Sequence, residues 1–122
     1  MGKIRVSVVT PTLNEERDLP QLLSSLKKQT FRDFEIIVAD AGSKDRTRQL
    51  AEEYGARVVD GGMPGVGRNR GAAVANGEYL FFFFADVVLP DDFLFKAVQE
   101  MDEQYIDLAT CAFYPISDLR LD

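Results

Sequence analysis

The chain has 122 residues, of which 46% are hydrophobic and 28% are charged, and its formal net charge is −6. This length provides for one domain, and the composition is that of a folded globular protein rather than a disordered one. There is no histidine and only one cysteine, Cys111, which excludes a Ser-His-Asp or Cys-His nucleophilic site, a histidine-bearing zinc site and an intrachain disulfide.

Charge is unevenly distributed along the chain. Residues 1–85 have 12 basic and 11 acidic side chains, whereas residues 86–122 have 2 basic and 9 acidic ones. The acidic balance argues against a nucleic-acid partner. The longest uninterrupted apolar run, Tyr79–Ala85, is far shorter than the ~20 residues that span a bilayer, and the N-terminus has no signal-peptide pattern. We therefore expect a cytoplasmic protein, with the cytoplasmic face of a membrane as an alternative location.

Strand and helix patterns alternate through the first half of the chain. β-branched residues favour strands, and apolar residues spaced three and four apart favour helices. The predicted elements are a strand at Ile4–Val9, a helix with its stripe at Leu19, Leu22, Leu23 and Leu26, a strand at Phe34–Ala39, a helix with its stripe at Thr47, Leu50, Ala51 and Tyr54, and a short strand at Arg57–Val59. Asp18 and Gln21 have the spacing of a capping box at the start of the first helix.

The same alternation continues in the second half. A glycine-rich loop precedes a helix of small residues, and the next strand is apolar on both faces, as a central parallel strand should be. The predicted elements are a helix at Gly67–Asn76, a strand at Tyr79–Phe84, a helix that begins near Pro90 with its stripe at Leu94, Ala97, Val98 and Met101, and a strand at Ile106–Tyr114. This order predicts a single α/β domain over residues 1–122, with an open, mostly parallel, Rossmann-like sheet flanked by helices.

Polar residues follow three of the predicted strands. In open parallel sheets, ligands bind beyond the carboxyl ends of the strands, where the strand order reverses. If the fourth strand lies beside the first, opposite the second, residues 10–16, 40–43 and 85–86 meet at one edge. We expect the binding site there.

Two carboxylates stand out at this edge. Asp40 follows a strand and could accept hydrogen bonds from a base or a ribose, or it could form a turn or a cap before the next helix. Asp86 follows a strongly apolar strand, where a hard cation is a natural partner, although a turn aspartate before Pro90 is the alternative.

The glycine-rich stretch PGVGRNRG does not match a known nucleotide fingerprint. Gly65, Gly67 and Gly71 have the wrong spacing for the dinucleotide motif and follow the third strand rather than the first, and no P-loop sequence occurs. Backbone N–H groups at a helix start, together with Arg68 and Arg70, could still hold an anion. The alternative is a tight loop with solvated arginines.

Three ordered segments resemble the family-2 glycosyltransferases, which are inverting enzymes with the GT-A fold. They are VSVVTPTLNEERDLPQLLSSLKKQT, DFEIIVADAGSKDRT and GRNRGAAVANGEYLFFFFADVVLPDDFL, which are similar to the family's PTxNE, VDDGSxDxT and ARNxGxxxAxGEYxxFLDADxxxxPxxL segments. The resemblance covers residues 4–95. Three motifs at family spacing are a much more specific signal than any one of them.

The resemblance implies a nucleotide-sugar donor, a UDP- or GDP-sugar, and roles for eight residues. Pro11, Leu13 and Glu15 would cradle the base, Asp40 would bind the base or ribose, and Gly67, Arg68 and Asn69 would approach the nucleotide from the facing loop. Asp86 matches the last aspartate of the family's Asp-x-Asp motif and would ligate Mg²⁺ or Mn²⁺ at the diphosphate. The chain then resembles the N-terminal, nucleotide-sugar-binding half of such an enzyme.

The sequence departs from the family pattern in two places. Ala41 replaces the second acid of the VDDGS segment, and we expect this change to have little consequence. Phe84 stands where Asp-x-Asp has its first aspartate, which predicts weaker metal and donor binding. The family's general base lies after the fifth strand, and no family motif surrounds Asp118 or Asp122, so neither is assigned that role.

The sequence leaves three functions to consider. The first is a glycosyltransferase acting on an unidentified acceptor, such as a polysaccharide, lipid or protein glycan. The second is a non-catalytic nucleotide- or nucleotide-sugar-binding module. The third, a flavodoxin-like or receiver-like domain, is disfavoured because the first strand is not followed by a paired acid cluster. An exposed sheet edge also predicts self-association.

Overall fold

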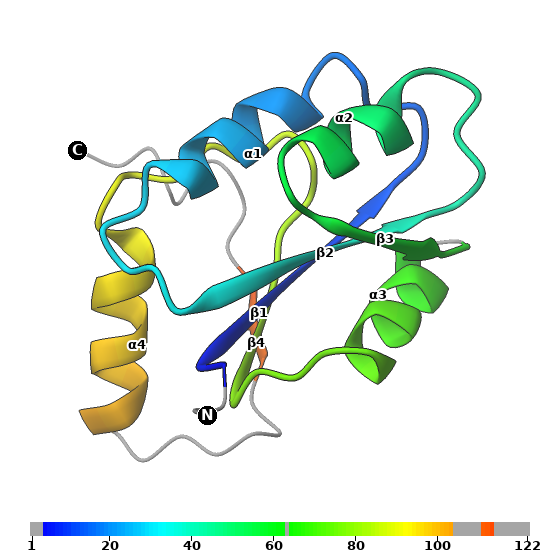
Figure 1. Ribbon diagram of the computed structural model, residues 1–122. Coiled ribbons are helices and arrows are strands. Elements are labelled where there is room, and N and C mark those ends of the chain that lie inside the picture. The colour runs from blue at the N-terminus through cyan, green and yellow to red at the C-terminus, as the bar shows by residue number, and fades with distance from the viewer. Residues whose placement is uncertain (1–3, 63, 104–110, 114–122) are drawn as a thin grey trace.

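The computed structural model describes residues 4–62, 64–103 and 111–113 (Figure 1). The strands are β1 Val6–Thr12, β2 Phe34–Asp40, β3 Arg57–Asp60, β4 Tyr79–Phe82 and β5 Cys111–Phe113. The helices are α1 Leu19–Lys27, α2 Thr47–Glu53, α3 Pro64–Ala73 and α4 Phe93–Glu103. Strands and helices alternate as the sequence predicts, although the other residues of the last predicted strand lie outside the described residues.

The strands form one parallel sheet in the order β3-β2-β1-β4-β5. In the central strand β1, Val9 pairs with Ile37 of β2 on one side and with Phe82 of β4 on the other. The chain builds outward from β1 to β3 and then returns to β4 on the opposite side of β1. The strand order therefore reverses at β1, as the argument for the binding site required, and the carboxyl ends of β1, β2 and β4 lie at one edge.

Helices cover both faces of the sheet. Figure 1 shows α1 and α2 on one side and α3 on the other. The larger core joins Val8 of β1 to the buried leucines of α1 and to Leu94 of α4. The smaller core is formed by Val9, Ile37 and Phe82, packed against α3. Burial on both faces explains why these strands are continuously apolar.

The run Phe81–Phe84 divides its side chains among three environments. Phe81 and Phe83 lie in the larger core, where each packs edge-to-face with Phe93 of α4. Phe82 lies in the smaller core, on the other face. Strand β4 ends at Phe82, two residues before the predicted end, and Phe84 is 38% exposed. The run is therefore mainly a core-forming strand, and its last residue emerges at the sheet edge.

Helix α1 starts without the predicted capping box. Its four stripe leucines are fully buried, as predicted. Asp18, however, makes no side-chain cap hydrogen bond, and its φ of −98° and ψ of −32° are helical. A capping side chain needs an extended backbone to reach the first free N–H groups. Instead, the backbone N–H groups of Asp18 and Leu19 donate to the carbonyl of Glu15.

Helix α3 lies unusually close to the sheet, and glycines permit this. It spans Pro64–Ala73, so it starts and ends three residues earlier than predicted. A Cβ on Gly71 would come within 2.3 Å of Val9 Cγ1, and one on Gly67 within 3.1 Å of Pro11 Cβ. The small residues of this helix are thus required by its contact with β1.

Candidate functional site

A cavity of about 460 Å³ lies at the carboxyl edge of the sheet. Its walls come from the segments that follow β1, β2, β3 and β4. The lining residues are Pro11, Thr12, Leu13, Glu15, Ala41, Gly62 and Phe84. Three residues predicted for the base, Pro11, Leu13 and Glu15, are therefore brought together at the predicted edge.

Asp40 is buried beside this cavity, and its carboxylate receives five hydrogen bonds from the protein. Thr12 Oγ1 donates to Oδ1 over 2.7 Å, and Ser43 Oγ donates to the same atom over 2.5 Å. The backbone N–H groups of Gly42 and Ser43 donate to Oδ2 over 3.0 and 2.7 Å. Arg48 Nε also donates to Oδ2, over 2.9 Å. The side chain is 0% exposed.

These bonds keep Asp40 ionised. Burial acts to raise its pKa, but the hydrogen bonds from Ser43, Thr12 and Arg48 outweigh burial and lower the pKa to about 2. The carboxylate holds its own loop, as the turn-forming alternative expects. The predicted contact of Asp40 with a base or ribose stays a prediction.

The loops after β1 and β2 hold each other in place. Asn14, whose φ is 55°, donates its backbone N–H to Ser43 Oγ over 2.7 Å and accepts the N–H of Lys44 on its side-chain oxygen over 2.8 Å. The N–H of Glu15 donates to Thr47 Oγ1 over 2.8 Å. Sequence reasoning missed this role for Asn14 and Ser43. The density of Asn, Ser, Thr and Asp in both segments is the signal that could have indicated it.

Glu15 brings negative charge to the cavity wall, and Asp86 follows Phe84, another lining residue, by two positions. Partial burial raises the pKa of Glu15, and the charges of Asp18, Asp86 and Asp45 raise it further. Asp86 itself is exposed. Its charge contributes to the raised pKa of Glu15, so the two carboxylates interact across the segments that follow β1 and β4.

The acidic environment fits a metal held jointly with a ligand. Within residues 4–62, 64–103 and 111–113, no three Asp, Glu or Cys side chains are grouped to hold a metal ion. Mg²⁺ is, however, usually bound through one or two carboxylates together with substrate phosphates and water. Asp86, with Glu15 near it, offers such a partial set of ligands.

The predicted residues of α3 do not line the cavity. Gly67 is buried against Pro11, which does line it. Arg68 is half-buried and Asn69 is exposed on the same helix. Gly67 therefore stands behind one wall, and the predicted approach of all three residues to a nucleotide stays a prediction.

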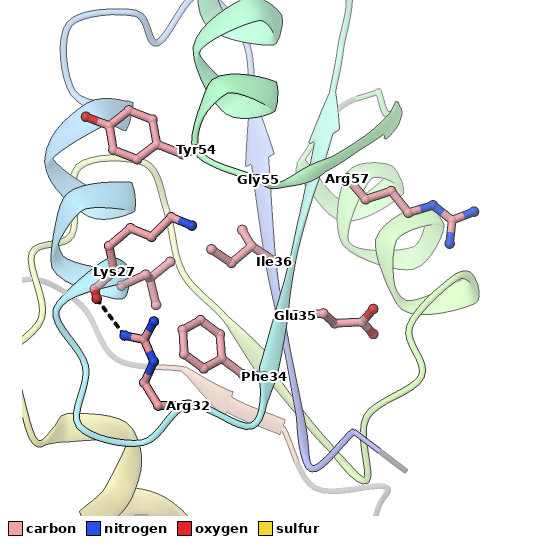
Figure 2. A pocket seen from close by; sticks show the side chains of 9 residues that line it. Lys27, Arg32, Phe34, Glu35, Ile36, Tyr54, Gly55 and Arg57 are labelled. Carbon is pink, nitrogen blue, oxygen red and sulfur yellow. Dashed lines mark hydrogen bonds between the residues drawn. The ribbon is translucent and has the colours of Figure 1, made fainter. Parts of the chain in front are cut away.

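A second cavity, of about 380 Å³, lies at the opposite end of the strands. Figure 2 shows Lys27, Arg32, Phe34 and Tyr54 around it, whereas Glu35 points away toward α3. Arg32 Nη1 donates to the carbonyl of Lys27, the last residue of α1, over 2.8 Å. Basic groups are expected at a helix carboxyl end, so these contacts have a structural explanation.

The described helices include none with the length and apolar character of a membrane span.

Comparison with known proteins identifies the family. The model of glycosyl transferase family 2 matches residues 7–121, which is most of the chain. The chain belongs to glycosyl transferase family 2. The cavity is built from the segments that carry this family's motifs.

Two bacterial relatives illustrate the similarity within family 2. The chain is 30% identical to the uncharacterized glycosyltransferase EpsJ of Bacillus subtilis, over 94% of this chain and 36% of EpsJ. It is 33% identical to the poly(ribitol-phosphate) beta-N-acetylglucosaminyltransferase TarS of Staphylococcus aureus, over 86% of this chain and 20% of TarS. The chain thus spans about a third or less of the length of these relatives.

Solved structures show the same fold. The structure of S. aureus TarS residues 1–349 in complex with UDP-GlcNAc matches with a TM-score of 0.76 and 34% identity, over 83% of this chain and 32% of that one. Glucosyl-3-phosphoglycerate synthase of Mycobacterium tuberculosis, in complex with Mn²⁺, UDP and glucosyl-3-phosphoglycerate, matches with a TM-score of 0.60 and 29% identity, over 69% of this chain and 35% of that one.

Proposed function

We propose that this chain is the donor-binding part of a glycosyltransferase that transfers a sugar from a nucleoside-diphosphate sugar to an acceptor. The observation that carries the proposal is the cavity at the carboxyl edge, where the family's first, second and third segments contribute Pro11, Ala41 and Phe84. The complexes of two relatives with UDP-GlcNAc or with UDP support a nucleotide sugar as the ligand. A cytoplasmic location and self-association remain predictions.

We also propose that Mg²⁺ or Mn²⁺ joins the diphosphate to Asp86. Such a metal would neutralise the charge of the departing nucleoside diphosphate as the bond to the sugar breaks. Asp86 provides an exposed carboxylate at the end of the segment that follows β4. The Mn²⁺ complex of the mycobacterial relative supports this choice.

Turnover distinguishes a glycosyltransferase from a non-catalytic nucleotide-sugar-binding module. We expect the chain to bind UDP- or GDP-sugars saturably in the presence of Mn²⁺ and to hydrolyse the donor slowly, which a coupled assay for released nucleoside diphosphate would detect. Saturable binding without hydrolysis would support a non-catalytic nucleotide-sugar-binding module. That alternative is favoured by one observation, the presence of Phe84 beside the acidic residues of the cavity. If no nucleotide binds, both functions are excluded.

Mn²⁺ affinity tests whether Phe84 weakens metal binding. We expect the parent chain to bind free Mn²⁺ weakly, because the residues that the structure describes include no group of three ligands. Phe84→Asp should tighten Mn²⁺ binding about tenfold, since a second carboxylate joins Asp86. Phe95→Asp, which places the same charge on an exposed position of α4, is the control. A Mn²⁺ titration followed by electron paramagnetic resonance measures the affinity of the parent and of both variants. Equal Mn²⁺ affinities of the parent and Phe84→Asp would contradict the expectation.

A further inference from the structure

One hydroxyl group connects the buried carboxylate of Asp40 to the loop that lines the cavity. Ser43 Oγ donates to Asp40 Oδ1 over 2.5 Å and accepts the backbone N–H of Asn14 over 2.7 Å. Asn14 lies between Leu13 and Glu15, and both of these neighbours line the cavity. The hydroxyl of Ser43 therefore attaches one wall of the cavity to the end of β2.

The orientation of this hydroxyl is fixed. The backbone N–H of Ser43 donates to Asp40 Oδ2 over 2.7 Å, so the residue is held to the carboxylate by two bonds. Because the hydroxyl proton points to Asp40, a lone pair of Ser43 Oγ is left for the N–H of Asn14. The negative charge of the carboxylate strengthens the whole chain of hydrogen bonds.

The backbone of Asn14 depends on this attachment. Its φ of 55° lies in the left-handed region, which residues other than glycine adopt at a cost in free energy and keep only where their surroundings hold them. Two bonds across the loops hold Asn14: its N–H to Ser43 Oγ, and the N–H of Lys44 to its side-chain oxygen. Loss of the hydroxyl removes one of these bonds and loosens the loop between Leu13 and Glu15.

We propose that Ser43 is a positioning residue for the nucleotide sugar. It holds Leu13 and Glu15 in the arrangement that the ligand meets, although Ser43 itself does not line the cavity. This inference rests on the proposed function, because it assumes a nucleoside-diphosphate ligand in the cavity. Without the hydroxyl, part of the binding free energy must be used to order the loop, so affinity falls.

Ser7 provides a matched control at the other end of the sheet. Ser7 Oγ donates to a carboxylate, Glu35 Oε2, over 2.5 Å and accepts a backbone N–H, that of Gly77, over 2.8 Å. Ser7 is fully buried near the start of β1, whereas Thr12 of the cavity wall is the last residue of that strand. Ser7→Ala thus removes the same two kinds of bond without touching the cavity.

Calorimetry of UDP binding in the presence of Mn²⁺ tests the proposal on the 122-residue chain. We expect Ser43→Ala to weaken UDP binding about tenfold, Ser43→Thr to keep the affinity within about threefold because it retains a hydroxyl, and Ser7→Ala to change it less than about twofold. Urea denaturation should show that Ser7→Ala loses at least as much stability as Ser43→Ala, because Ser7 is fully buried.

Amide hydrogen exchange measured by NMR provides a readout that needs no ligand. We expect the Asn14 amide to exchange about tenfold faster in Ser43→Ala and at the parental rate in Ser7→Ala. Asn14→Gly provides a second variant if Ser43→Ala does not fold. It keeps the left-handed backbone accessible but removes the side-chain oxygen that accepts from Lys44, and it should weaken UDP binding about fivefold.

The outcomes separate this proposal from the proposed function. Unchanged UDP affinity in Ser43→Ala, or equal losses in Ser43→Ala and Ser7→Ala, would overturn the positioning role while the parent still binds the nucleotide. A loss in Ser43→Thr as large as that in Ser43→Ala would overturn the role of the hydroxyl. Failure of the parent to bind either UDP or GDP would reject the proposed function, and the positioning role with it.

Discussion

Asp40→Asn is expected to lower the free energy of unfolding by about 3 kcal/mol and the melting temperature by about 10 °C. The carboxylate accepts from Thr12, Ser43, Arg48 and the backbone of Gly42. An asparagine has one acceptor oxygen, so its amide NH₂ group would face donors that then have no partner. Urea denaturation at pH 7 measures the loss.

Asp60→Asn is the matched control, because Arg48 binds both carboxylates. Arg48 Nη2 donates to Asp60 Oδ1 over 2.8 Å, but the Asp60 side chain is 78% exposed. An exposed ion pair contributes about 0.5 kcal/mol, so the control should change stability little. Equal losses in the two variants would show that burial of Asp40 is not the source of its effect.

The low pKa of Asp40 predicts a pH dependence with a definite sign. Its folded-state pKa of about 2 lies below the ordinary value of 3.8, so the ionised form stabilises the fold. This stabilisation, about 2 kcal/mol, is fully present above pH 5 and disappears as pH falls through about 2. The stability difference between the parent and Asp40→Asn should therefore narrow between pH 5 and pH 2. A constant difference across that range would contradict the assigned pKa.

Gly71→Ala is expected to destabilise the chain by about 2 kcal/mol, although alanine favours helices over glycine. The added Cβ would lie 2.3 Å from Cγ1 of Val9, which is fully buried in the central strand. Helix α3 must then move away from β1, or Val9 must shift within a packed core. A thermal melt followed by circular dichroism measures the effect.

Gly65→Ala provides the comparison within the same helix. Its Cβ would meet only Arg68 Nη2, at 4.0 Å, so helix propensity should dominate and stability should rise by up to about 1 kcal/mol. Adding Val9→Ala to Gly71→Ala should restore part of the lost stability by removing the clashing methyl. If Gly71→Ala melts at the same temperature as Gly65→Ala, the close contact between α3 and β1 is not present in solution.

Much of the fold follows from local pattern. The leucine spacing identified α1, and the β-branched run identified β2. A helix or strand that buries one face must place apolar residues at the repeat of that element, so the repeat is visible in the sequence. The position of β4 beside β1, which the sequence argument took as a condition, is the one found, and crossover connections leave few topologies for such an alternation. The ends of β1, α3 and β4 were predicted less well, since packing and hydrogen bonds between elements set them.

Some features of the candidate site could likewise be predicted from the sequence, and others could not. The sequence alone determined the family, the sheet edge that forms the site, and the convergence of Pro11, Leu13 and Glu15, because motifs and strand order are properties of the chain. Only the tertiary structure decided that Asp40 is enclosed and that Ala41 and Phe84 share a cavity. A carboxylate binds a ligand or its own loop according to which donors surround it. For Asp40 those donors come from β1, from the loop after β2 and from α2, which only folding brings together.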